Sequence, residues 1–252
     1  MRIRATVAKS IADLGIGIFL FVLLTCSFAQ AQETMDRAKV EQIIREYLLQ
    51  NPELMLEVQD ALQIRQQEQL AQQQTDTIEL KRERLFGTEG QLALGNKDAE
   101  VTVVEFFDYN CGFCQRAMED MQRIVEANDN VRFVLKEFPV LGEGSVEATR
   151  VSLAFTKLMP EKAGEFHVRL LGLPGAKDGN RAMQLAGEMG IDEATMLAEM
   201  DKSHVIESIS EVYALAEGLG ITGTPSYVVG NKVVFGAVGY DKLKEEMASQ
   251  LN

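Results

Sequence analysis

Apolar side chains recur at helical spacing from Asp36 onward. The apolar positions follow one another at i, i+3, i+4, i+7 and i+8, and they are Val40, Ile43, Ile44, Tyr47 and Leu48. This spacing predicts an amphipathic helix with Asp36 as its N-cap, which Asn51-Pro52 ends. Pro52 suits the first turn of a second helix, and this helix is predicted to continue to about Arg84, because no Gly or Pro interrupts it.

The second predicted helix is too polar to be buried alone. Eight Gln lie between Gln59 and Gln74, and the apolar positions are sparse: Leu54, Met55, Val58, Leu62 and Leu70. Such a helix either extends into solvent or pairs with copies of itself. We expect self-association through residues 36–75, because the first helix has an apolar face that little neighbouring chain can cover. A solvated linker is the alternative.

After Phe86-Gly87 the pattern changes to that of buried strands. Residues 101–107 and 131–138 are rich in Val and Phe and predict two strands, with a helix from Cys114 to about Ala127 between them. A strand, a helix and a strand in this order indicate a parallel βαβ unit.

The rest of the chain is predicted to be helical apart from one hairpin. Residues 145–218 predict helices, with breaks at 159–160 and 173–175. Residues 227–235 predict a β-hairpin that turns at Gly230-Asn231, and a last helix runs from about Tyr240 to Leu251.

The first thirty residues have the pattern of a secretory signal. Basic residues precede an apolar run over 16–24, and small residues at 29–31 have the spacing of a signal-peptidase site. We predict a signal peptide over residues 1–31. The alternative, an uncleaved membrane anchor, is disfavoured because the run is shorter than the roughly 20 residues that span a bilayer.

Charge and compartment follow from this cleavage. The whole chain has 252 residues and a net charge of -13. Cleavage would remove three basic residues and one acidic residue, leaving 22 Lys and Arg against 37 Asp and Glu, a net charge of -15. Because nucleic-acid binding depends on clustered basic residues, no nucleic-acid partner is expected. The two remaining cysteines would lie in an oxidising compartment, in a bacterium the periplasm.

The segment Cys111-Gly112-Phe113-Cys114 carries the candidate chemistry. A disulfide across so short a loop stabilises a fold little, so a structural staple is disfavoured. A zinc site needs further ligands, but only His167 and His204 are available, and we interpret both as packing or surface residues. The remaining interpretation is a redox dithiol, with no metal and no cofactor.

The position of the pair assigns a role to each sulfur. Cys111 lies where a strand meets a helix, so unpaired N–H groups and the helix dipole favour its thiolate, the attacking species in disulfide exchange. Cys114 lies one turn further and is predicted to resolve the mixed disulfide. Gly112 and Phe113 carry no charge, so we expect a milder oxidant than a site with His there.

Three features together resemble the DsbA-type thioredoxin-fold proteins of the bacterial periplasm. They are the segment from Glu105 to Cys114, the inserted helices, and Gly223-Thr224-Pro225. The N-terminal region resembles the ScsC-like (suppressor of copper sensitivity C) branch. The resemblance implies an α/β thioredoxin-like fold over 87–252, with a helical insertion at about 142–218. A helical oligomerisation region over 32–86 would precede it.

The resemblance also implies roles for single residues. Thr224-Pro225 matches the cis-proline loop that lies against the dithiol, and Glu105 matches a buried acid beneath it. Such a carboxyl should have a raised pKa through desolvation and relay the proton of Cys114, and Lys136 on the next strand is its candidate partner. Phe113 would make a hydrophobic contact beside the reactive sulfur.

These roles predict a thiol–disulfide oxidoreductase. Thr before the proline, together with the absence of His between the cysteines, favours isomerase or reductase character over oxidation. The expected partners are secreted proteins with cysteines, met as transient mixed disulfides, and a membrane redox protein of the DsbD or DsbB type. A homo-oligomer is expected, and a trimer is the expected form. The alternatives are a monomeric DsbA-like oxidase and a Cu(I)-binding or holdase protein, although the eleven Met form no regular, repeated Met-x-x-Met run.

Overall fold

A computed structural model describes residues 36–88 and 90–250 of the chain. The predicted signal peptide therefore lies outside the described residues. Within the described ranges, no helix combines the length and the apolar character that crossing a bilayer requires. The chain divides into two compact units, of which the first ends at Ile64 and the second begins at Arg65.

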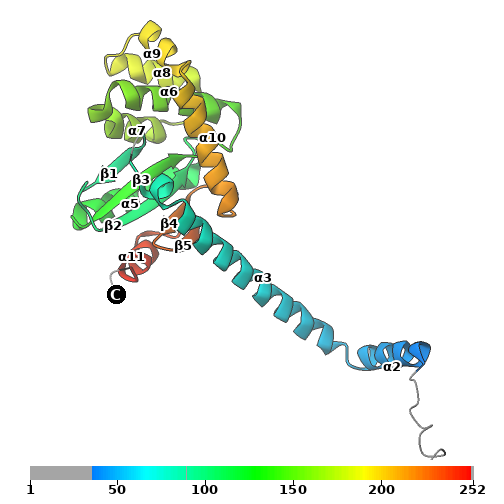
Figure 1. Cartoon of the computed structure of the whole chain (residues 1–252). Helices are drawn as coiled ribbons and strands as arrows, with labels where there is room; N and C mark the ends of the chain where they lie inside the picture. The colour runs from blue at the N-terminus through cyan, green and yellow to red at the C-terminus, as the bar shows by residue number, and fades with distance from the viewer. Residues whose placement is uncertain (1–35, 89, 251–252) are drawn as a thin grey trace, which may run out of the picture. The chain divides into compact units, whose positions relative to one another are not determined.

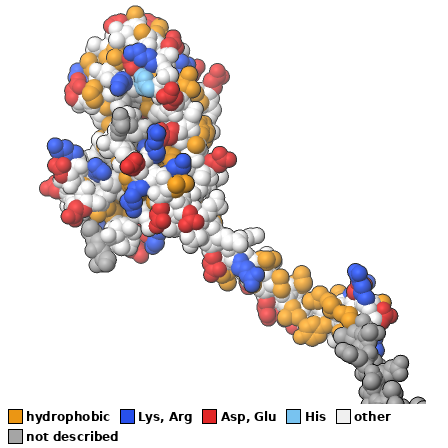
Figure 2. Space-filling model, viewed as in Figure 1, with side chains coloured by type: hydrophobic (Ala, Val, Ile, Leu, Met, Phe, Trp, Pro, Cys, Tyr) orange, Lys and Arg blue, Asp and Glu red, His pale blue; other side chains and the backbone are white. Residues whose placement is uncertain are grey.

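The first unit contains the two predicted N-terminal helices. Helix α2 spans Arg37–Gln50, and the Asp36 carboxylate caps it by accepting a 3.3 Å hydrogen bond from the Ala38 N–H. Helix α3 spans Glu53–Leu80, of which the part up to Ile64 belongs to this unit. No residue of α2 is buried, and apolar side chains gather on the surface of these helices (Figure 2).

The second unit is built on a five-stranded sheet in the order β1-β3-β2-β4-β5. Its strands are β1 (Leu92–Gly95), β2 (Val101–Phe107), β3 (Val131–Glu137), β4 (Ser226–Val229) and β5 (Lys232–Phe235). Strands β2 and β3 are parallel and are joined by helix α5 (Gly112–Ala127), as the βαβ pattern predicts. The other neighbours are antiparallel, and β4 and β5 form the predicted hairpin, with Gly230 in the left-handed conformation at its turn.

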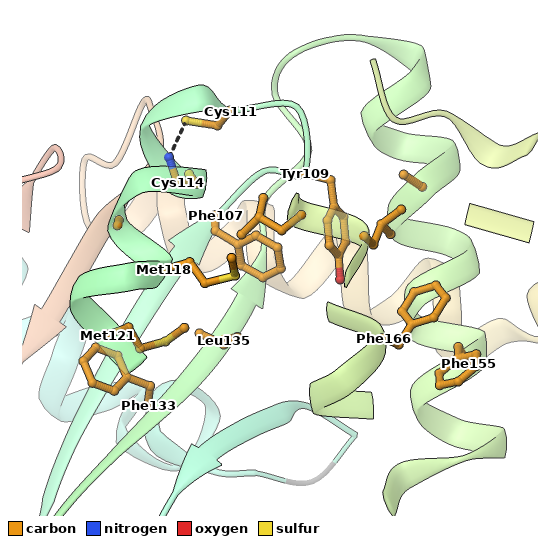
Figure 3. Packing of buried hydrophobic residues seen from close by; sticks show 14 of the residues in the cluster. Phe107, Tyr109, Cys111, Cys114, Met118, Met121, Phe133, Leu135, Phe155 and Phe166 are labelled. Carbon is orange, nitrogen blue, oxygen red and sulfur yellow. Dashed lines mark hydrogen bonds between the residues drawn. The ribbon is translucent and has the colours of Figure 1, made fainter. Parts of the chain in front are cut away.

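Alternation along β2 separates two hydrophobic clusters. Val103 and Phe107 point to the face that α5 and helix α11 (Tyr240–Ala248) cover. Figure 3 shows Phe107 beside Met118 of α5 in this cluster. Val104 and Phe106 point to the opposite face, against helix α10 (Ser203–Gly218), the end of α3 and helix α4 (Arg82–Phe86). The thioredoxin-like α/β fold with inserted helices is thus confirmed.

The helical insertion follows β3. It consists of α6 (Glu143–Leu158), a 3₁₀ turn (Pro160–Lys162), α7 (Ala163–Gly172), α8 (Gly179–Glu188), α9 (Glu193–Met200) and α10. Helices α6, α8 and α9 gather beyond the sheet, and α10 runs back alongside it (Figure 1). The predicted breaks are present. Two further helix starts follow Asp178 and Asp192, whose carboxylates accept hydrogen bonds from N–H groups three residues later.

The end of α3 packs into the second unit. Ile78 is fully buried in the cluster behind the sheet, and the Gln74 side chain donates a 2.9 Å hydrogen bond to the Leu219 carbonyl. The second compact unit begins at Arg65, so it includes this end of α3. The sequence pattern does not predict this contact, because a Gln is expected at the surface unless a buried hydrogen-bond partner is known.

Candidate active site

Cys111 is the N-cap of helix α5. Its Sγ accepts a 3.3 Å hydrogen bond from the Cys114 N–H, shown as the dashed line in Figure 3, in the position where a capping oxygen usually lies. The sulfur thus lies at the end of a 16-residue helix where N–H groups are otherwise unpaired and the helix dipole is positive. This environment stabilises a negative charge on Cys111.

Hydrogen bonds with the thiolate lower the pKa of Cys111 to about 5. The largest contribution is the hydrogen bond with the Cys114 side chain. The Thr224 side chain and the N–H groups of Cys114 and Phe113 contribute further, whereas burial acts in the opposite direction. At neutral pH the Cys111 sulfur is therefore predominantly a thiolate.

Cys114 has the opposite environment. It is fully buried, and the same hydrogen bond with Cys111, followed by burial, raises the pKa of its thiol far above the ordinary range. Both cysteines are free thiols in this structure. The arrangement keeps one sulfur charged and one protonated, which is the division that the sequence predicts for a nucleophile and a resolving residue.

A buried carboxylate holds the loop that carries Cys111. Asp108 Oδ1 accepts hydrogen bonds of 2.7 Å from the Asn110 N–H and from the Ser145 hydroxyl. Its Oδ2 accepts from the N–H groups of Val140 and Leu141, at 2.8 and 2.9 Å. Asp108 therefore ties the β2–α5 loop to the chain after β3. Sequence analysis missed this residue, because its role depends on partners more than thirty residues away.

Asn110 ties the same loop to the helical insertion. Its side-chain amide donates to the Lys177 carbonyl and accepts from the Lys177 N–H, each at 2.7 Å. This two-way pairing imitates a strand pair between the residue before Cys111 and the segment before α8. The loop that carries the nucleophile is thus tied both to the chain after β3 and to the helical insertion.

A buried polar chain lies behind this loop. The Tyr109 hydroxyl is 2.7 Å from the Ser152 hydroxyl and 3.3 Å from His167 Nδ1, and Ser152 donates to Glu137 at 2.8 Å. His167 packs edge-on against Phe107, and burial lowers its pKa to about 3, so it is neutral. His167 is therefore a packing residue, as predicted.

The Thr224–Pro225 peptide bond is cis, as the resemblance implies. The Cys111 thiol, when protonated, donates to the Thr224 carbonyl over a 3.2 Å Sγ–O distance. The fold thus brings together the dithiol and a loop more than a hundred residues further along the chain. A backbone carbonyl beside the sulfur is also a group that an extended client segment can pair with.

Glu105 lies in β2 beneath the dithiol. Its side chain is only 3% exposed and lies between Leu135 of β3 and Tyr227 of β4 in the sheet register. Burial, followed by the charge of Cys111, raises the pKa of Glu105 to about 8. The expected raised pKa is confirmed.

Lys136 does not pair with Glu105, and this expectation is wrong. Leu135 is the residue that lies opposite Glu105, so Lys136 points to the other face of the sheet, where its Nζ donates to the Arg84 carbonyl at 2.7 Å. Side chains alternate along a strand, so a neighbour one residue off the register faces away.

Two apolar side chains are exposed near the loop that carries the buried sulfur. Phe113 is 58% exposed next to Cys111, which is itself only 5% exposed, and Leu141 is exposed beside the Asp108 network. Within the described part of the chain, no group of three His, Cys, Asp or Glu side chains could hold a metal ion. The two sulfurs are the soft ligands available at this site.

Comparison with known proteins matches both parts of the chain. The profile of the DSBA-like thioredoxin domain matches residues 102–248, and that of the copper resistance protein ScsC N-terminal domain matches residues 36–69. Disulfide bond formation protein D of Bacillus subtilis is 28% identical over 172 residues, which are 64% of this chain and 78% of that protein.

Two solved structures are similar over most of their length. A thioredoxin-like oxidoreductase from Silicibacter pomeroyi is 39% identical, with a TM-score of 0.64 over 68% of this chain and 97% of that one. A linker-deletion mutant of Proteus mirabilis ScsC is 25% identical, with a TM-score of 0.65 over 88% of this chain and 99% of that one. The similarity to ScsC therefore extends into the N-terminal helices.

Proposed function

The chain belongs to the DSBA-like thioredoxin domain family of thiol–disulfide oxidoreductases, and from this premise we propose that it rearranges or reduces disulfides of secreted proteins in the periplasm. Cys111 is the nucleophile and Cys114 the resolving residue. The observation that carries the proposal is the Cys111 sulfur at the start of α5, held as a thiolate beside a protonated Cys114.

The reaction proceeds in two exchanges. The Cys111 thiolate attacks one sulfur of a client disulfide, so that a bond from Cys111 to the client forms and the other client sulfur leaves as a thiolate. Cys114 can then attack Cys111, which oxidises the dithiol to a disulfide and leaves the client reduced by two electrons. In isomerisation, a different client thiolate displaces Cys111, and the dithiol returns unchanged.

Glu105 handles the proton of the second exchange. Cys114 must lose its proton before it attacks, and none of its surface is exposed to solvent, so a protein group is needed to accept that proton. Glu105 has a pKa of about 8, close to neutrality, so it can take up and return a proton during turnover. We therefore assign Glu105 as the proton carrier, with Thr224 and Pro225 as the loop that receives the client backbone.

Residues at the site and the N-terminal helices both support isomerase or reductase character. Thr224 precedes the cis proline, and Gly112 and Phe113 between the sulfurs carry no charge. In addition, the N-terminal helices match the ScsC domain and expose apolar side chains such as Ile44 and Tyr47. Through these faces the chain forms a homo-oligomer, with a trimer expected, and several dithiols can engage one misfolded client. A membrane partner of the DsbD type would keep the dithiol reduced.

A disulfide oxidase with a DsbB-type partner is the second candidate. One observation favours it: a pKa of about 5 for Cys111 stabilises the reduced form, which makes the corresponding disulfide a stronger oxidant.

The experiment compares the full mature chain with two α2 variants in the refolding of ribonuclease that contains scrambled disulfides. Ile44→Glu places a charge on the exposed apolar face, and Gln42→Glu is the matched control on the same helix. We expect sedimentation to show an oligomer for the wild type and the control, both of which unscramble the substrate. Ile44→Glu should be monomeric and lose this activity, while its Cys111 alkylates as fast as before.

Two results would each overturn one part of the proposal, the isomerase activity or its dependence on self-association. A wild type that oxidises reduced ribonuclease but does not unscramble it would establish the oxidase instead. Equal unscrambling by Ile44→Glu would remove the role of self-association.

A further inference from the structure

Arg116 lies beside the dithiol with an unneutralised charge. Its guanidinium stacks on the Phe113 ring, 4.4 Å from the ring centroid, and its side chain is exposed. In the described part of the chain, no acidic side chain forms an ion pair with Arg116. Its hydrogen-bond donors are therefore available to a molecule that approaches Cys111.

Arg123 on the same helix shows that the stacking alone is not unusual. Its guanidinium lies 4.3 Å from the Tyr240 ring centroid, but Asp120 pairs with it at 3.7 Å. At 1.5 Å per residue, Arg116 follows Cys111 by about 8 Å along the helix axis and Arg123 by about 18 Å. The cation near the sulfur is thus left unpaired, whereas the distant one is neutralised.

We propose that Arg116, held in place on Phe113, selects client segments that carry an acidic residue next to the disulfide under attack. This inference rests on the proposed function and names the substrate class of the same site. The exposed Phe113 ring follows Cys111 by two residues at the start of α5 and carries the Arg116 guanidinium, so residues that flank a client disulfide at Cys111 come within reach of Arg116. A guanidinium pairs with a carboxylate through two parallel hydrogen bonds, and stacking reduces the conformational freedom lost on pairing.

The overall charge makes a local cation useful. At a net charge of -13 the chain repels acidic segments at long range. The single unpaired Arg116 beside the dithiol attracts acidic segments instead, within about one Debye length, roughly 8–10 Å at physiological salt. Hydrogen bonds account for the low pKa of Cys111, against the opposing effect of burial. Arg116 therefore acts on the client and not on the sulfur.

The test uses three small disulfides that differ in charge: oxidised glutathione (anionic), bis(2-hydroxyethyl) disulfide (neutral) and cystamine (cationic). In each case the Cys111 thiolate displaces one half of the probe as a thiolate, and Cys114 displaces the other half. The dithiol becomes a disulfide and the probe two thiols. Because the chain contains no Trp, oxidation of the reduced full-length protein is followed by rapid alkylation and mass measurement.

The readout is the ratio of rates for charged and neutral probes. Arg116→Gln should lower the anionic-to-neutral ratio about threefold and raise the cationic-to-neutral ratio similarly, which is the effect of one charge at about 8 Å near a wet surface. Arg116→Lys, which keeps the charge, should retain most of the selectivity. Arg123→Gln is the matched control and should leave both ratios unchanged. In about 1 M salt the difference between wild type and Arg116→Gln should vanish.

Several outcomes would overturn the inference. It fails if Arg116→Gln changes the three rates by one common factor, if Arg116→Lys behaves like Arg116→Gln, or if Arg123→Gln shifts the ratios as much. In these cases the neutral probe still reacts at Cys111 and the proposed function stands. If the wild type reacts with none of the probes, the proposed function fails, and the inference fails with it.

Discussion

Replacing Glu105 by Gln tests whether this side chain is a buried neutral acid. In the reduced protein its pKa is raised from an ordinary value of 4.5 to about 8, mainly by burial. Between these two pH values the folded state holds a proton that the unfolded state has lost. The free energy of unfolding must therefore fall as the pH rises through this interval. The contribution is complete below pH 4.5 and is lost as the pH passes 8.

The size of the effect follows from the same two values. A difference of 3.5 pH units corresponds to about 5 kcal/mol, of which about 3 kcal/mol has been lost at pH 7. Gln has nearly the same shape but does not titrate. At pH 7 the free energy of unfolding of Glu105→Gln should therefore be about 3 kcal/mol higher than that of the wild type. Near pH 4 the two free energies of unfolding should differ little.

The assay is urea unfolding of the reduced protein, followed by circular dichroism at several pH values between 4 and 8. Glu137 is also buried, with a pKa raised to about 8, so it contributes to the wild-type pH dependence as well. The difference between the wild type and Glu105→Gln isolates Glu105. Glu119→Gln, on the exposed face of α5, is the control and should match the wild type. Parallel pH profiles for the wild type and Glu105→Gln would refute the reasoning.

Two further substitutions test the site and the fold. Thr224→Val removes a hydroxyl that hydrogen-bonds the Cys111 thiolate, so the pKa of Cys111 should rise by about one unit, measured by the pH dependence of alkylation; an unchanged pKa would exclude this hydrogen bond. Ile78→Ala should lower the free energy of unfolding by about 2–5 kcal/mol, because it leaves a cavity in the second unit, whereas the exposed Ile64→Ala should change it by less than about 0.5 kcal/mol. Equal urea midpoints for these two variants would place the end of α3 outside the core.

The regular elements around the dithiol could be predicted from the sequence. The strands at 101–107 and 131–137 and the hairpin carry long apolar runs and turn residues that local pattern detects. Strand β1 was missed because it has only four residues, two half-buried and two exposed, at the edge of the sheet. The cis bond before Pro225 was expected from the family resemblance, since no local pattern specifies it.

The failures concern contacts that depend on register or on distant partners. Lys136 was paired with Glu105 because both lie in neighbouring strands, but the register sets Leu135 opposite Glu105 and turns Lys136 away. Asp108 appears in the sequence as one more acidic residue. Its function in holding the nucleophile's loop becomes visible only when the chain near Val140 is placed beside it.

The central claim is that Cys111 is a thiolate at neutral pH, and its rate of alkylation as a function of pH tests this claim most directly. Iodoacetamide labels the reduced full-length protein at a series of pH values, and mass spectrometry of peptides separates Cys111 from the buried Cys114. The structure predicts that the Cys111 rate reaches half its maximum near pH 5. A half-maximum near pH 9, the ordinary value for a cysteine, would contradict the account.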